Sequence, residues 1–218
     1  MRKVFLPLLL VTAAMFVYAP IIVARAPFES TMFLLQKIFY FHVPSWMAGS
    51  VGIAISALGG LWYVFKGDRR ADWYAVSGAE VALMFGAMGL ATGPMWARKA
   101  WGVWWQWDAK LTIALLLFLV FVSYLLLRKY GGPGSDKLSA AVALFGLAMS
   151  PFVYYAVDIW RTIHPANTVV PSLGPGMRGA FWFCAVTFLM FCALLVAVRV
   201  RLERLRSTLD DLYLAEDE

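Results

Sequence analysis

Charged residues, cysteines and histidines are all scarce in this sequence. Only 15% of its 218 residues are charged, 62% are hydrophobic, and there are two cysteines and two histidines. The mean hydropathy is +0.72, whereas a water-soluble domain typically has about 25% charged residues. The composition therefore excludes a water-soluble globular protein and indicates a chain that lies in a membrane.

Two kinds of chemistry have no sequence signal in this chain. Cys184 and Cys192 lie eight residues apart in an apolar segment, and this spacing matches neither a CxxC redox pair nor a pair of metal ligands. We expect both thiols to be buried in the core. No Walker-type phosphate-binding loop is present, so any ATP hydrolysis would be carried out by another chain.

Six apolar segments dominate the sequence, each near or above the roughly 18 residues that are needed to cross the hydrocarbon core of a bilayer. They cover about residues 4–24, 43–65, 74–95, 111–127, 137–157 and 177–199. The connections are short, so we expect residues 1–218 to form a single integral membrane domain. The predicted fold class is all-α, a polytopic membrane protein with six transmembrane helices.

The N-terminus resembles a signal peptide in one respect, because Arg2 and Lys3 precede the first apolar segment. This segment is longer than the apolar region of a signal peptide, which has about 7 to 15 residues. We therefore expect the first span to be retained. Cleavage would leave the topology of the later spans unchanged.

The distribution of lysine and arginine predicts the orientation. Twelve of the 19 basic residues lie at the N-terminus, in the loops at 66–73 and 128–137, and in the tail at about 200–218 with the end of the last span. The positive-inside rule therefore places both termini in the cytoplasm. The external segments would be about 25–42, 96–110 and 158–176, and they are the longer and more aromatic connections.

Both histidines of the chain, His42 and His164, fall on the predicted external side. The densest aromatic cluster, WGVWWQWD at residues 101–108, falls there too. Neutral imidazole is a common ligand of haem iron, and two histidines from different segments can occupy the two axial positions. The alternative is that the aromatic residues only anchor the protein at the membrane interface.

Two geometries are open for the tryptophan-rich segment. A helix would place Trp101, Trp104, Trp105 and Asp108 on one side, whereas an extended chain would pair Trp105 with Trp107. In either geometry the indole faces can contact a planar ligand. The propionates of a haem would need a nearby cation, and the external candidates are Lys110, Arg161 and Arg178.

Three motifs together resemble a known family. The segment WGVWWQWDAKLT at 101–112 resembles the tryptophan-rich WWD motif of haem-handling proteins of cytochrome c maturation, in particular the CcmC, or haem exporter protein C, family, which is related to CcmF and CcsA. FYFHVPS at 39–45 looks like the first histidine motif of that family, and RTIH at 161–164 looks like the second. Chain length, six spans and motif order also agree.

The resemblance implies a function and a set of site residues. His42 and His164 would be the axial ligands of haem b (protohaem) at the external face of the bacterial inner membrane. The implied partners are a periplasmic haem chaperone of the CcmE type, ABC-transporter subunits of the CcmA and CcmB type, and a small membrane subunit of the CcmD type. The implied haem platform consists of Trp101, Trp104, Trp105, Trp107 and Asp108, with Lys110 beside it.

The sequence departs from the family pattern at two positions. Lys110 stands where arginine is usual, which removes a bidentate partner for a propionate. Pro165 follows His164 where a polar residue is usual, and it biases the His164 backbone toward an extended conformation.

The predicted function is non-catalytic, but two other classes of function fit parts of the pattern. One is an electron-transfer cytochrome with a permanent bis-histidine haem, and another is a cytochrome c synthase. Cytochromes usually place their ligands within helices, and the synthases are longer and carry more histidines. Glu80 is an acid inside the third span, and the sequence allows two interpretations of it: a structural role, or contact with a partner or ligand.

Overall fold

The computed structural model describes residues 2–216, and it confirms an all-α chain with six helices long and apolar enough to span a membrane. Two short 3-10 helices, η1 (Leu34–Ile38) and η2 (Asn167–Val169), lie in the connections. The long helices are α1 (Arg2–Arg25), α2 (Phe39–Lys66), α3 (Arg69–Trp101), α4 (Ala109–Tyr130), α5 (Ser135–Ile159) and α6 (Pro175–Glu216).

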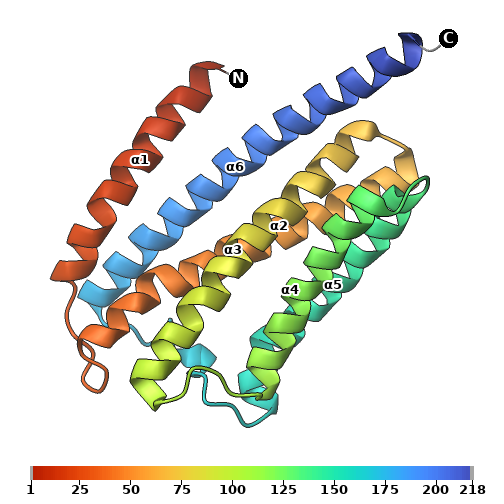
Figure 1. Ribbon diagram of the computed structural model, residues 1–218. Coiled ribbons are helices and arrows are strands. Elements are labelled where there is room, and N and C mark those ends of the chain that lie inside the picture. The colour runs from red at the N-terminus through yellow and green to blue at the C-terminus, as the bar shows by residue number, and fades with distance from the viewer. Residues whose placement is uncertain (1, 217–218) are drawn as a thin grey trace.

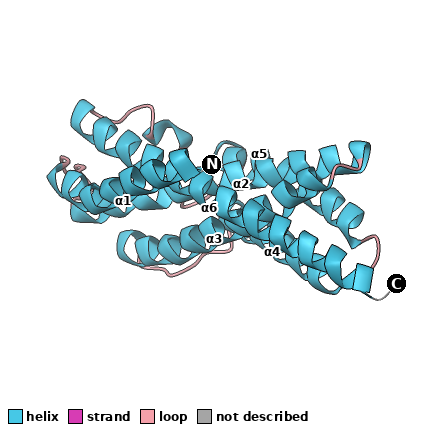
Figure 2. Cartoon of the chain, turned by 90° about the horizontal axis from the view of Figure 1, so that it is seen from above, coloured by secondary structure: helices cyan, strands magenta, loops and turns pink. Residues whose placement is uncertain are grey.

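Helices α2 and α3 form the centre of the bundle. Helices α4 and α5 pack on one side of this pair, and α6 and then α1 pack on the other side (Figure 1). Within the described residues the chain contains no β-strand, and its loops only join helix ends (Figure 2). The helices alternate in direction, so both termini lie at one end of the bundle (Figure 1). The connections α1–α2, α3–α4 and α5–α6 share the opposite end.

Small residues allow α2 and α3 to approach closely. A Cβ atom on Gly78 would lie 2.5 Å from the backbone nitrogen of Ser56, and one on Gly52 would lie 2.8 Å from that of Ala82. Backbone atoms cannot move aside without moving the helix. The glycines therefore set the helix spacing, as small residues do in membrane proteins where association depends on packing contacts.

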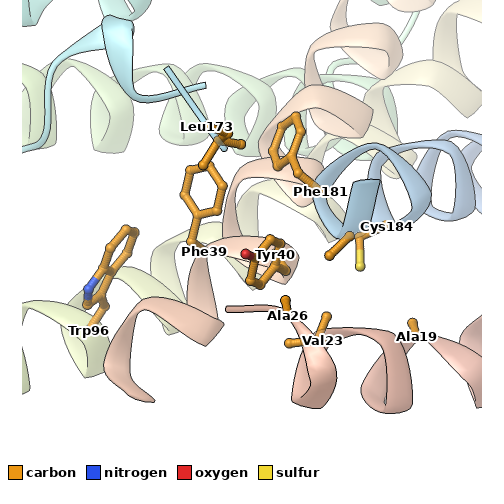
Figure 3. Packing of buried hydrophobic residues seen from close by; sticks show 10 residues of the cluster. Ala19, Val23, Ala26, Phe39, Tyr40, Trp96, Leu173, Phe181 and Cys184 are labelled. Carbon is orange, nitrogen blue, oxygen red and sulfur yellow. The ribbon is translucent and has the colours of Figure 1, made fainter. Parts of the chain in front are cut away.

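The end of the bundle that carries the three longer connections is held by an apolar cluster. Phe39, Tyr40 and Phe181 gather between α2 and α6, and Trp96 of α3 lies beside them (Figure 3). The ring centroids of Phe39 and Phe181 are 5.2 Å apart. The cluster also buries Cys184, and both cysteines are buried and unbridged, as expected from their spacing.

Helix α6 is longer than its apolar segment. With 42 residues, it is about 63 Å long at 1.5 Å per residue, roughly twice the thickness of a bilayer core. Its second half carries Arg199, which donates hydrogen bonds to the Glu80 carboxylate and lies 3.1 Å from Glu203. Glu80 is therefore part of an ion pair between α3 and α6.

Candidate functional site

His42 lies in the first turn of α2, and only 6% of its surface is exposed. Its Nδ1 atom is 2.8 Å from the hydroxyl oxygen of Thr92 on α3. The same hydroxyl is 2.8 Å from the carbonyl oxygen of Met88. The ring is thus held by the neighbouring helix, and its Nε2 atom has no hydrogen-bond partner among residues 2–216.

One face of α3 surrounds the His42 ring. The Cε1 atom of His42 lies 3.4 Å from where a Cβ atom on Gly93 would stand. The indole of Trp46, one turn further along α2, lies directly against Gly89. Trp96 presents its ring to His42 at 5.8 Å between centroids and an angle of 78°. This face leaves the imidazole little room to rotate.

The tryptophan-rich segment is not a helix, so the helical geometry for 101–108 is wrong. Trp101 is the last residue of α3, and Gly102 ends the helix with a left-handed φ of 79°, a conformation that favours glycine. The chain then runs without regular structure to Asp108. Trp105 and Trp107 pack edge to face at 5.7 Å, which agrees with the pairing expected of an extended chain.

The four tryptophans of this segment have different surroundings. Trp101 lies against Trp96, with ring centroids 6.1 Å apart and an angle of 34°, so that aromatic contacts run from Trp101 through Trp96 to His42. Trp105 is half-buried, whereas Trp104 and Trp107 are 61% and 74% exposed. The indole N–H groups of Trp96 and Trp105 are buried without a partner among the described residues.

Asp108 joins the tryptophan-rich segment to the His164 segment. One carboxylate oxygen accepts a hydrogen bond from the Leu111 backbone at 2.9 Å and caps the N-terminus of α4. The other oxygen accepts from the Thr162 hydroxyl and, at 3.1 Å, from the Ile163 backbone. The carboxylate is buried by these contacts, so it holds the two segments together.

His164 lies in the connection between α5 and α6. Its Nδ1 atom is 2.9 Å from the carbonyl oxygen of Pro165, and its backbone N–H donates to the Thr162 hydroxyl at 3.1 Å. Burial, together with the nearby positive charge of Lys110, lowers the pKa of His164 to about 4. The ring is therefore neutral at neutral pH, the state in which imidazole binds a metal.

The Lys110 ammonium contacts backbone carbonyls in the C-terminal half of α5. It donates a hydrogen bond to the Val153 carbonyl at 3.1 Å and lies 3.5 Å from the carbonyl oxygen of Tyr154. Arg161 is exposed and lines the same open pocket as His164. Arg178 is exposed and donates to the Pro171 carbonyl at 3.3 Å.

The fold brings the predicted residues to one end of the bundle. His42, at the start of α2, and His164, in the α5–α6 connection, both lie at the end of the bundle opposite to the termini. An open pocket of ≈ 400 Å³ lies beside His164 and is lined by residues of 157–166. In residues 2–216 no cluster of three or more histidine, cysteine, aspartate or glutamate residues could hold a metal ion.

Sequence reasoning missed two residues of this site, Thr92 and Trp96. Both lie on α3 among the positions 89, 92, 93 and 96, which share one face of a helix. That spacing is visible in the sequence, but it does not show that this face of α3 packs against His42.

The fold and the site define a class of polytopic membrane protein that gathers two histidines and a tryptophan-rich segment at one end of a six-helix bundle. The family model described as "Heme exporter protein C" (CcmC) matches residues 1–214. The chain belongs to this family.

Individual relatives agree with the family match. The "Heme exporter protein C" of Escherichia coli K12 is 30% identical over 175 residues, which cover 76% of this chain and 69% of the relative. That of Bradyrhizobium diazoefficiens is 31% identical over 202 residues, or 88% of this chain and 76% of the relative. That of Paracoccus denitrificans is 31% identical over 192 residues, or 83% and 78%.

Proposed function

We propose that this protein binds haem at the extracytoplasmic face of the bacterial inner membrane and passes it to a periplasmic haem chaperone for the maturation of c-type cytochromes. His42 and His164 are the axial ligands of the iron. Haem is the cargo of the protein, and it supplies the iron to which both imidazoles bind. The role is transport rather than catalysis, in line with the word "exporter" in the names of the relatives.

One observation supports this proposal: two histidines from distant segments lie at the same end of the bundle, each with Nδ1 engaged by the protein. His42 contacts Thr92 through Nδ1, and His164 contacts the Pro165 carbonyl through Nδ1. In both rings Nε2 is left without a partner among the described residues. An iron ligand needs this arrangement, with one nitrogen oriented by the protein and the other available.

The aromatic residues fit the porphyrin rather than the iron. A porphyrin is a large flat apolar ring, and indole rings offer it dispersion contacts over a wide area. The buried and unpaired N–H groups of Trp96 and Trp105 are donors that a bound polar group would satisfy. The proposed platform consists of Trp101, Trp104, Trp105 and Trp107.

Asp108 and Lys110 take part in the proposed site through other residues. Asp108 holds the His164 segment against the start of α4, so its contribution is to position a ligand. Lys110 is bound to α5, and its charge favours the neutral form of His164. Propionates would then pair with a more exposed cation such as Arg161.

Transfer requires a site that releases its cargo. Trp104 and Trp107 are exposed, so one side of the aromatic platform is open to a chaperone of the CcmE type. The proposed membrane partners are ABC-transporter subunits of the CcmA and CcmB type and a small CcmD-type subunit. The cargo is protohaem, haem b.

The experiment that tests haem binding compares absorption spectra of the purified protein. After addition of haem, the wild type should show a low-spin bis-imidazole spectrum. A His42→Ala, His164→Ala variant should lose it, whereas Trp62→Phe, near the other end of α2 and about 30 Å from His42 at 1.5 Å per residue, should keep it. Equal spectra for the wild type and the double variant would refute the proposal.

A second measurement separates transfer from a permanent cytochrome. Haem-loaded protein is mixed with purified CcmE-type chaperone, the two are separated, and haem is measured on each. Haem should appear on the chaperone. Haem that stays with the membrane protein would support an electron-transfer cytochrome instead.

A further inference from the structure

The hydroxyl of Thr92 carries only one proton but lies close to more than one group, including the Gly89 carbonyl oxygen at 3.3 Å. It lies 2.8 Å from the Met88 carbonyl oxygen, which can only accept, and 2.8 Å from Nδ1 of His42, which donates or accepts according to the tautomer. If the hydroxyl donates to Met88, as threonine in a helix commonly does, its oxygen faces Nδ1 with a lone pair. Both contacts are then hydrogen bonds only if Nδ1 of His42 carries the proton.

From this contact we infer that Thr92 is a positioning residue that fixes His42 as the tautomer protonated at Nδ1, so that the lone pair of Nε2 is free to bind the haem iron. The inference rests on the proposed function for the role of Nε2. The tautomer itself is a property of the chain alone. Neutral histidine in water favours the opposite tautomer, with the proton on Nε2, and that form has no lone pair there for a metal.

Packing on the same face of α3 supports the assignment. Gly93 lies under the Cε1 atom of His42, and Trp96 stands edge-on to the ring. Gly89, one turn earlier, makes room for Trp46. These contacts hold the plane of the imidazole, so Nδ1 stays directed at the Thr92 hydroxyl. This face of α3 thus supplies both a hydrogen-bond acceptor for Nδ1 and packing contacts that restrict rotation of the ring.

His164 shows the same arrangement with a different acceptor. Its Nδ1 atom is 2.9 Å from the Pro165 carbonyl oxygen, which can only accept, so this ring too is protonated at Nδ1. The two candidate ligands therefore present the same nitrogen, although one is held by a side chain and the other by the backbone. Only the contact to His42 can be removed by a side-chain substitution.

The test is ring ¹⁵N NMR on histidine-labelled protein without haem. The chain has only two histidines, so two ring systems appear, and His164→Ala assigns them. In the wild type, His42 should be protonated at Nδ1 and unprotonated at Nε2. Thr92→Val, which keeps the β-branched shape but lacks the hydroxyl, should raise the Nε2-protonated form to half or more, and Thr92→Ser should restore the wild-type ratio.

Two results would overturn the inference: a wild-type His42 protonated at Nε2, or a tautomer ratio that Thr92→Val leaves unchanged. Because no haem is present, these results are independent of whether the protein binds haem. A second readout uses loaded protein. A hydrogen bond from Nδ1–H makes the imidazole a stronger donor and favours ferric iron, so Thr92→Val should raise the reduction potential and Thr92→Ser should not. An equal potential in all three proteins would contradict the role of Thr92 at the iron.

Discussion

The contact between Asp108 and the His164 segment can be broken without removing the helix cap. Asparagine caps a helix about as well as aspartate, but its amide has one acceptor oxygen instead of two. If this oxygen stays on the Leu111 N–H, the amide NH₂ faces the Ile163 N–H, which can only donate, and the Thr162 hydroxyl, which would have to change from donor to acceptor. Asp108→Asn should therefore keep the start of α4 and release residues 160–166.

The expected size follows from the lost hydrogen bond of the Ile163 amide. A hydrogen bond to a charged acceptor contributes about 1.5–3 kcal/mol, and about 1.4 kcal/mol corresponds to a factor of ten. The Ile163 amide donates directly to the carboxylate, so its hydrogen exchange should become about 10 to 100 times faster in Asp108→Asn. If His164 is an iron ligand, haem affinity should fall as well, because the ligand must be ordered again on binding.

Residue-resolved hydrogen exchange measures the protection of the Ile163 amide, and the Leu111 amide of the same protein serves as the control. The Leu111 amide should exchange at the wild-type rate in Asp108→Asn, where the cap is kept, and faster in Asp108→Ala, where the cap is lost. If Ile163 is equally protected in the wild type and in Asp108→Asn, the carboxylate does not hold the His164 segment. Faster exchange of Leu111 and Ile163 together in Asp108→Asn would also refute the separation of the two contacts.

Three further predictions concern other parts of the molecule. Glu80→Ala breaks the ion pair with Arg199, in which the Glu80 and Arg199 side chains are 29% and 31% exposed, and should lower the free energy of unfolding by about 1–3 kcal/mol. Thermal unfolding should show this loss while the haem spectrum stays unchanged. An altered spectrum would contradict a purely structural role. Gly78→Ala should separate α2 from α3 and lower the unfolding temperature, whereas Gly179→Ala, where a Cβ meets open space, should not. Equal unfolding temperatures for the two variants would show that Gly78 does not set the spacing of α2 and α3. The pKa of His164 is about 4, below the ordinary 6.5, so the folded protein binds fewer protons between these values than the unfolded chain. The contribution of His164 to stability is therefore full above pH 6.5 and is lost as the pH falls toward 4. A ring NMR titration should find His164 neutral at pH 5.5, and protonation near 6.5 would show that burial does not lower its pKa.

Asp108 shows which contacts a sequence motif predicts and which it does not. The motif predicts that this acid belongs with the tryptophans, and a single aspartate before an apolar run is also a helix N-cap signal. It does not predict the contacts to Thr162 and Ile163, because these residues come 54 and 55 positions later. Whether they meet depends on how α4 and α5 pack.

The tryptophan-rich segment shows a similar limit. Composition predicts an aromatic cluster at the membrane surface, but both a helix and an extended chain fit the spacing. Glycine is a weak helix former, so Gly102 argues only mildly against a regular helix. In the folded chain its left-handed φ ends α3 after Trp101.

The six helices follow from the sequence alone, because a segment that crosses the hydrocarbon core must be long, apolar and hydrogen-bonded within itself. The scarcity of histidine likewise singles out His42 and His164 as candidate ligands. The tertiary structure decides what surrounds them. Thr92 meets His42 only because glycines on both helices let α2 and α3 approach. The Asp108 carboxylate meets the His164 segment only because the α3–α4 and α5–α6 connections lie side by side. Local rules of helix formation act over a few residues, whereas the orientation of a ligand depends on contacts between helices that are distant in the chain.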